Sequence, residues 1–162
     1  MKANDGTGNI PERDEWQTPQ NLFNKLNKQY DFTFDCCAEG YNHKTIGFSN
    51  DFLKIDFRVV LNVCWMNPPF SKSYEMFEHF FKFLNKGVAI YRCDNMETKL
   101  WQDIILKNAT WIFIPKGRIC YEGMKGSGSR FPSALIGYNV KPPKDLNGFC
   151  LEIYKKLIGD KK

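Results

Sequence analysis

The sequence lacks several features that would place its 162 residues in a large class of proteins. It holds no run of about 18 apolar residues, so nothing in it is expected to span a membrane. The first residues, MKANDGTGNIPERDEW, are polar and carry no apolar signal region, which argues against secretion. No repeat period is visible. These absences favour a cytoplasmic protein.

Signs of a metal site or of disulfides are also missing. The six cysteines, at positions 36, 37, 64, 93, 120 and 150, form no C-x-x-C pair, and the two histidines complete no zinc pattern with them. Several cysteines lie inside apolar runs such as NVCW and RICY. We expect free, buried thiols in a reducing cytoplasm and no bound metal.

The composition fits one ordinary globular domain. The chain is 43% hydrophobic, which suffices for a packed core, and its formal net charge is +5. This mild positive charge permits a polyanionic partner but fits an ordinary soluble surface equally well. Residues 1–14 mix glycine, proline and charges without periodicity, so we predict a flexible arm followed by a single domain over residues 15–162.

Hydrophobic spacing predicts strands that alternate with helices. The first helix is expected to have Thr18 as its N-cap and Pro19 at its first helical position, and a strand should follow over residues 32–34. Further helices are predicted at residues 71–86 and 96–109. Strands are predicted at residues 59–66, 88–93, 110–115 and 134–138, and residues 149–157 fit a strand or a helix. This order indicates an α/β fold with a mostly parallel sheet, in which ligands bind beyond the carboxyl ends of the strands.

One of these strands ends unusually, in the stretch VCWMNPPF at residues 63–70. Proline has no backbone N–H and a fixed φ, so a Pro-Pro pair stops a strand abruptly and leaves a stiff loop at its tip. That tip is expected at the ligand-binding edge of the sheet.

The four residues at this tip, Asn67, Pro68, Pro69 and Phe70, suit a reaction at an amino group on an aromatic ring. The lone pair of such a nitrogen is delocalised into the ring. Acceptors on its two N–H bonds, the Asn67 side-chain carbonyl and the Pro68 backbone carbonyl, would favour a tetrahedral nitrogen. Phe70 would stack on the ring. We therefore predict that these four residues are catalytic.

The motif resembles the (Asp/Asn)-Pro-Pro-(Tyr/Phe) motif of amino-methyltransferases. Six segments follow the order of the phage-type DNA N-6-adenine methyltransferase (Dam) family: WQTPQNLF, FTFDCCA, NDFL, WMNPPF, IPKGRICY and FPSALIGY. The resemblance covers about residues 14–138. It implies a Rossmann-like class I methyltransferase fold with helices on both faces of the sheet. It also implies S-adenosylmethionine as cofactor and site-specific methylation of adenine that is flipped out of DNA.

The resemblance places contacts at both ends of the cofactor. WQTP matches the segment that holds the methionine end, through Trp16, Thr18 and Pro19, and the alternative is a helix cap with a packed Trp. NDFL matches the acidic motif beside the cofactor's adenine, with Asp51 as the acid and Phe52 flanking the ring. An aspartate in a turn is the alternative there.

FDCCA matches the family's short version of the first cofactor motif. Asp35 would accept hydrogen bonds from the cofactor's amino group or ribose, while Cys36, Cys37 and Ala38 would let the backbone approach. The stretch between Asp35 and Asn67 is too short for two complete strand–helix units, so we expect the sheet to be trimmed there.

A basic, glycine-rich segment, PKGRICYEGMKGSGSR, is predicted to contact DNA. It carries Lys116, Arg118, Lys125 and Arg130, which suit phosphate contacts, although a solvated loop is the alternative. We expect no separate target-recognition domain, so site choice would come from short loops or from a partner subunit.

Other interpretations of the motif stay open from the residues alone. The same chemistry fits cytosine N4 in DNA, adenine in RNA or a protein amide, and a catalytically silent nucleic-acid-binding remnant is an interpretation from another class. The expected setting is the cytoplasm of a bacterial host, with a phage or prophage as the source.

Overall fold

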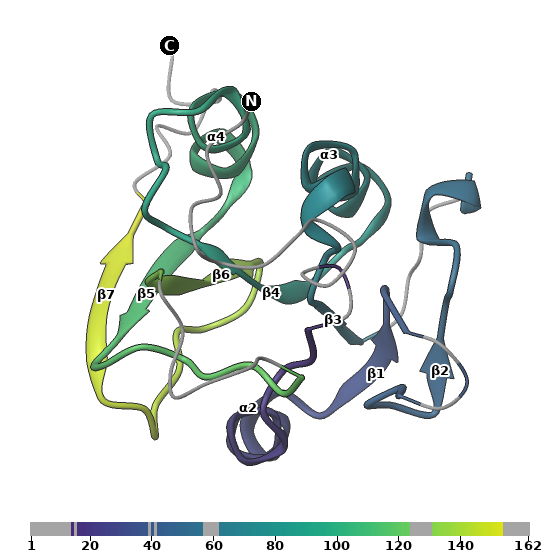
Figure 1. Cartoon of the computed structure of the whole chain (residues 1–162), viewed down its shortest axis with the longest axis horizontal. Coiled ribbons are helices and arrows are strands. Elements are labelled where there is room, and N and C mark those ends of the chain that lie inside the picture. Colours follow the sequence, from purple (N-terminus) through teal and green to yellow (C-terminus); the bar gives the residue numbers. More distant parts are fainter. Residues whose placement is uncertain are drawn as a thin grey trace, which may run out of the picture.

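The strands form one sheet in the computed structural model, which describes residues 14, 16–38, 40, 42–56, 62–123 and 131–153. Its order is β2-β1-β3-β4-β6-β5-β7 (Figure 1). The strands are β1 (Phe32–Asp35), β2 (Gly47–Phe48), β3 (Val63–Met66), β4 (Gly87–Arg92), β5 (Trp111–Pro115), β6 (Ser133–Tyr138) and β7 (Gly148–Glu152). The short strand β1 thus lies beside β3, although β2 lies between them in the sequence.

The sheet is mostly parallel, as predicted. Strands β2, β1, β3 and β4 pair in parallel, and β6 is antiparallel to both β4 and β5. Strand β5 therefore runs in the same direction as β4, while β6 and β7 run the opposite way. The carboxyl ends of β1, β3, β4 and β5 consequently meet at one edge of the sheet.

Helices cover both faces of the sheet, which confirms the predicted fold class (Figure 1). Helix α2 (Gln20–Tyr30) packs on one face, and α3 (Ser73–Phe83) and α4 (Leu106–Asn108) lie on the other. Each face has its own apolar core. Phe23, Leu26 and Trp65 are among the core residues on the α2 side, and Phe77, Phe80 and Trp101 are among those on the α3 side.

The region between β1 and β3 is short, as the sequence predicts. Its described residues contain the two-residue strand β2 and a single 3-10 turn, η1 (Phe52–Lys54), and no α-helix. Residues 39, 41 and 57–61 lie outside the described part of the chain.

Two helix starts differ from the predictions. Helix α2 begins at Gln20, with Pro19 as its N-cap in an extended conformation (φ −55°, ψ 132°), and the Pro19 carbonyl accepts from Phe23 N at 3.0 Å. The prediction of Thr18 as the cap was therefore wrong by one position. Helix α3 begins at Ser73, after a 3-10 turn, η2 (Phe70–Lys72), whereas the predicted helix begins at residue 71, and it has no side-chain capping bond.

The third predicted helix is mostly a π-helix. Residues Leu100–Ile105 form the π-helical element η3, which passes directly into α4. Its buried residues include Leu100 and Trp101, and the Trp101 indole N–H donates to the Arg92 carbonyl at 3.2 Å. The helix is thereby joined to the carboxyl end of β4. No helix in the described ranges is long and apolar enough to cross a membrane.

The strand predictions were close where the structure describes them. Residues 63–66 of the predicted strand at 59–66 are extended, while residues 59–61 lie outside the description. Of the segment 149–157, which fits a strand or a helix by its sequence, residues 149–152 belong to the antiparallel edge strand β7, and residues 154–157 lie outside the description. The flexible arm predicted for residues 1–14 lies outside the description apart from Asp14.

Candidate active site

The carboxyl edge of the sheet brings the motif residues beside the first cofactor motif. Asp35 is the register partner of Trp65, and Met66 is the register partner of Ala89. Asn67 directly follows Met66, so it lies next to the carboxyl end of β1 on one side and next to the second half of β4 on the other. This is the edge at which an α/β sheet binds its ligands.

The Asn67 side chain is held in one orientation by the N-terminal segment. Its amide nitrogen donates to the main-chain carbonyl of Trp16 at 3.0 Å. A carbonyl oxygen can only accept, so the amide nitrogen must face Trp16 and the Oδ1 atom must face away. Neither Asn67 Oδ1 nor the Pro68 carbonyl receives a hydrogen bond from the described residues. Two adjacent acceptors are thus available at the strand tip.

Phe70 sits in a cluster of aromatic rings. Its ring centroid lies 6.0 Å from Trp16 and 5.6 Å from Phe131, both edge-on at 81° and 74°, and 5.9 Å from Tyr91. Trp16 in turn stacks on Phe131 at 6.0 Å and 19°. Phe70 is half-buried and packs against the cores on both faces of the sheet. Its ring is therefore held by neighbouring rings, although the residue as a whole is not fully buried.

Backbone pairing and side-chain contacts attach the N-terminal segment to the sheet edge. Gln17 and Glu122 exchange two backbone hydrogen bonds of 3.0 and 2.8 Å, and the Glu122 carboxylate accepts from Gln20 N at the start of α2. The Asp14 carboxylate accepts from Ser71 N at 2.9 Å and from the Ser71 hydroxyl. The chain ahead of α2 thereby becomes one wall of the site.

Thr18 supplies the observation that tests whether a cofactor fits this site. Its side chain is buried, and its Oγ1 atom has no hydrogen-bond partner among the described residues. A buried hydroxyl without a partner costs about 1–3 kcal/mol, so native proteins rarely leave one. The carboxylate of the cofactor's methionine end is a group that can accept from this hydroxyl, but Thr18 is only 2% exposed, so its neighbours would need to shift as for a ligand at a buried side chain, and the contact stays a prediction. Pro19 follows it in the chain, and Trp16 stands two positions before it.

Asp35 is buried and already serves the fold. Its two carboxylate oxygens accept from Cys37 N at 3.2 Å and from Lys44 N at 3.1 Å. Burial raises the pKa of Asp35 above its usual value, and the two backbone hydrogen bonds act against that rise. The carboxylate therefore shapes the loop that follows β1, and its contact with a cofactor stays a prediction.

The backbone after Asp35 is also engaged within the chain. Cys36 N donates to the Trp65 carbonyl at 2.9 Å, and Ala38 N donates to the Ser49 carbonyl at 3.0 Å. These N–H groups extend the sheet pairing beyond β1. A cofactor that approaches Cys36 and Ala38 would therefore meet their carbonyl groups or make van der Waals contacts with them, and this contact stays a prediction.

The predicted acidic motif beside the cofactor's adenine divides into two environments. Asp51 is exposed and pairs with Lys54 at 2.7 Å. Phe52 is only 2% exposed, and its ring packs edge-on against His79 at 4.8 Å. Both roles stay predictions, and the buried Phe52 ring would need to shift to flank a ligand.

The thiols near the site are unsuited to nucleophilic chemistry. Cys36 and Cys64 are buried and free, as predicted, whereas Cys120 is exposed. Burial raises the pKa of Cys64 to about 12 and raises that of Cys36 and Cys37 as well. These thiols are neutral near pH 7, when the thiolate is the reactive form.

The basic segment begins at the same edge of the sheet. Lys116 and Arg118 are exposed and closely follow the carboxyl end of β5 at Pro115. The same segment returns to the site through the pairing of Glu122 with Gln17. Lys125 and Arg130 lie outside the described residues.

Comparison with protein families agrees with this geometry. The family model for DNA N-6-adenine-methyltransferase (Dam) matches residues 6–135, most of the chain. The chain belongs to the Dam family. No match was found among curated proteins. Membership of the Dam family implies methylation of adenine N6 in DNA with S-adenosylmethionine as methyl donor, which favours DNA adenine over the other substrates that the motif alone allows.

Several contacts of this Dam-family site were not predicted from the sequence. The link between Asp14 and Ser71 is one, because the sequence predicts Ser71 only as the first residue of a helix. The aromatic partners Tyr121 and Phe131 are others. They lie in or beside the basic segment, where the aromatic residues interleaved with the charges were the available signal.

Proposed function

We propose that this Dam-family chain methylates the N6 amino group of an adenine that is flipped out of DNA, and that residues 67–70 form the pocket for that base. Asn67 Oδ1 and the Pro68 carbonyl accept the two amino hydrogens. Their pull on both N–H bonds favours a tetrahedral nitrogen and frees its lone pair for reaction.

The orientation of the Asn67 amide is the observation that carries this proposal. With its nitrogen engaged by the Trp16 carbonyl at 3.0 Å, the amide keeps its oxygen turned away from Trp16 before any substrate arrives, which supports a role of that oxygen as the acceptor. A rotated amide would present a donor to the donor hydrogens of the amino group and would repel it. Because this orientation is set in advance, the amide does not need to reorient during the reaction. Such preorganisation of polar groups is the main source of electrostatic catalysis.

Phe70 and its neighbours hold the base. Stacking between a base and an aromatic side chain contributes about 1–3 kcal/mol, and the contacts of Phe70 with Trp16, Phe131 and Tyr91 keep its ring in place. A base inside the duplex cannot reach such a recessed edge, so the enzyme must extrude it or act on single strands.

The cofactor would be held by Thr18 at its methionine end, with Trp16, Pro19, Asp35, Cys36, Ala38, Asp51 and Phe52 as the further predicted contacts. When bound, S-adenosylmethionine supplies a methyl group on a positively charged sulfur, and that sulfur keeps the electron pair of the broken bond. The amino nitrogen forms the new bond to carbon and then loses a proton to water. Neither Asn67 nor Pro68 can take this proton, because neither group titrates near neutral pH.

Lys116, Arg118, Lys125 and Arg130 would contact DNA phosphates and fix the register of the duplex. Such contacts carry no sequence information by themselves. Site choice would then rest on the short loops at the same edge of the sheet.

The direct test is product analysis. The purified protein is incubated with methyl-labelled S-adenosylmethionine and either duplex DNA, single-stranded DNA or RNA, and the nucleosides are identified by mass spectrometry. We expect label in N6-methyladenine nucleosides from DNA and a loss of that label in Asn67→Ala. Label in N4-methylcytosine or only in RNA would contradict the proposed substrate, and an inactive protein that still binds DNA would indicate a silent remnant.

A further inference from the structure

The N-terminal segment contacts the catalytic loop at both of its ends. At the start of the loop, the Trp16 carbonyl accepts from the Asn67 amide at 3.0 Å. At its end, the Asp14 carboxylate accepts two hydrogen bonds from Ser71, one from the backbone N–H at 2.9 Å and one from the hydroxyl. Asp14 and Trp16, which are close in the sequence, thus bind the two ends of the catalytic loop at Ser71 and Asn67.

The loop between these points is stiff, so fixing its ends fixes what lies between. Pro68 and Pro69 restrict the backbone, and Pro69 is extended with φ −61° and ψ 136°. Phe70 then enters the 3-10 turn η2, where Ser71 stands. The position of the Phe70 ring and the Pro68 carbonyl therefore depends on where Asn67 and Ser71 are held.

We propose that Asp14 is a positioning residue for methyl transfer, acting through Ser71. It touches neither substrate nor cofactor in this proposal. It sets the far end of the loop, while Trp16 sets the near end, so that the two acceptors and the Phe70 ring keep the spacing that the amino group requires. The inference rests on the proposed role of Asn67 and deepens it.

The location of the contact argues against a purely structural role. Ser71 is exposed and Asp14 is half-buried, and hydrogen bonds between exposed groups contribute little to folding stability. A catalytic group displaced by about 1 Å, in contrast, can lose on the order of a hundredfold in rate. Removal of the Asp14 carboxylate should therefore affect the chemical step far more than the thermal stability.

The test measures single-turnover methylation of duplex DNA at saturating S-adenosylmethionine in four variants: Asp14→Ala, Asp14→Asn, Ser71→Ala and the double variant Asp14→Ala/Ser71→Ala. Asp14→Ala should lower the rate about tenfold with unchanged cofactor affinity. Asp14→Asn keeps one acceptor oxygen and Ser71→Ala keeps the backbone N–H, so each should lose less. Because Ser71 is the only proposed route, the double variant should be no slower than Asp14→Ala.

Asp103→Ala is the matched control. It removes the same charge from an exposed ion pair with Lys107, in a helix to which the proposal gives no role, and should keep the wild-type rate. If Asn67→Ala abolishes activity while Asp14→Ala and Ser71→Ala keep it, the positioning role is wrong and the proposed function stands. Multiplying effects of Asp14 and Ser71 would also overturn it. If Asn67→Ala itself remains active, the proposed function fails first. Should Asp14→Ala fail to fold, Ser71→Ala and Asp14→Asn still decide, since wild-type rates in both would refute the positioning role.

Discussion

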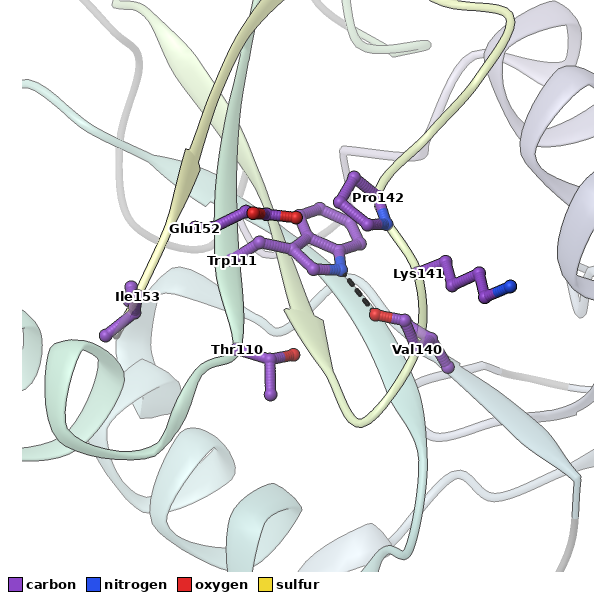
Figure 2. Close-up of a pocket in the computed structure, with 7 residues that line it drawn as sticks. All are labelled: Thr110, Trp111, Val140, Lys141, Pro142, Glu152 and Ile153. Carbon is purple, nitrogen blue, oxygen red and sulfur yellow. Dashed lines mark hydrogen bonds between the residues drawn. The ribbon is translucent and has the colours of Figure 1, made fainter. Parts of the chain in front are cut away.

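The two edges of the sheet differ in how their polar groups are used. At the edge opposite the site, an open hollow of about 550 Å³ is lined by Thr110, Trp111, Val140, Lys141, Pro142, Glu152 and Ile153 (Figure 2). There the Trp111 indole N–H donates to the Val140 carbonyl at 2.7 Å, and the Thr110 hydroxyl donates to Gly137 and accepts from Asn139 N. At the carboxyl edge, the Thr18 hydroxyl and Asn67 Oδ1 have no such partner among the described residues.

The presence of a hollow does not by itself mark a functional site. At the far hollow, the Trp111 indole and the Thr110 hydroxyl both have partners within the fold, and Trp111 fills the space over Gly137, where a Cβ atom would collide with the indole. Among the described residues, three buried side-chain atoms have no hydrogen-bond partner, namely Thr18 Oγ1, Thr33 Oγ1 and Asn95 Oδ1, and Thr18 is the one that the sequence assigns to the cofactor. Because buried polar groups are nearly always satisfied, Thr18 Oγ1 is the atom to test for a ligand. The following variants test this contrast between the edges.

The largest effect is expected for Asn67→Ala. The change removes one of two acceptors from the target amine but leaves Phe70 and the cofactor contacts in place. The chemical step should fall by about a hundredfold or more, the scale of losing one preorganised polar group. Single-turnover methylation at saturating cofactor measures that step, and cofactor affinity by calorimetry should hold at the wild-type value.

Asn67→Asp serves as the comparison for this variant. A carboxylate can still accept from the amino group, so the loss should be smaller than for Asn67→Ala. It should not vanish, because one carboxylate oxygen would then face the Trp16 carbonyl and lose the 3.0 Å hydrogen bond that orients the amide. A wild-type rate in Asn67→Ala would mean that the motif is only a stiff strand end.

Thr18→Val should have smaller effects, and it should lower the affinity for the cofactor without lowering the stability of the cofactor-free protein. The substitution keeps the shape and removes the hydroxyl, so the protein without cofactor should be as stable as wild type or more so, by about 1 kcal/mol. Cofactor affinity should fall about tenfold, the loss of one hydrogen bond to a charged group. Thermal unfolding with and without S-adenosylmethionine measures both. If the variant is destabilised and binds the cofactor normally, Thr18 is a structural residue.

Much of this site was predictable because its chemistry is local in the sequence. The run of two prolines after an apolar strand fixes where β3 ends, and the alternation of strands and helices fixes which edge receives it. The α/β class, the helices on both faces and the short region between β1 and β3 follow from the same patterns. The reversed directions of β6 and β7 do not, since a strand pattern contains no direction.

Contacts between distant segments were beyond the sequence. The donation of Asn67 to Trp16 spans 51 positions, and that of Ser71 to Asp14 spans 57. Asp35 shows the same limit in reverse. Its place at a strand tip suggested a ligand contact, which stays a prediction, but did not suggest that Cys37 N and Lys44 N donate to its oxygens. The π-helical form of η3 was likewise not predictable, because the spacing of its apolar residues also fits an α-helix.

Substitutions in the basic segment should lower the affinity for DNA more than the rate of methyl transfer. Replacing Lys116, Arg118, Lys125 and Arg130 by glutamine should weaken DNA binding and lower its salt dependence. The log–log slope on duplex DNA should fall by about 0.9 for each phosphate that the variant no longer neutralises. Fluorescence anisotropy over a range of salt concentrations measures the slope. An unchanged slope in the quadruple variant would show that the segment is a solvated loop.

The smallest effect is expected at the opposite edge, where Lys141→Ala/Glu152→Ala removes one charge of each sign and leaves the net charge unchanged. Both side chains are exposed, and the hydrogen bond of Tyr30 to residue 141 uses its backbone carbonyl, which the substitution keeps. Surface changes away from functional groups usually alter free energies by no more than about 0.5 kcal/mol, so the methylation rate and the DNA affinity should stay within about twofold of wild type. The same single-turnover and anisotropy assays apply. A tenfold fall in either quantity would make the far hollow a second working surface, and the contrast between satisfied and leftover polar groups would then fail to separate the two edges.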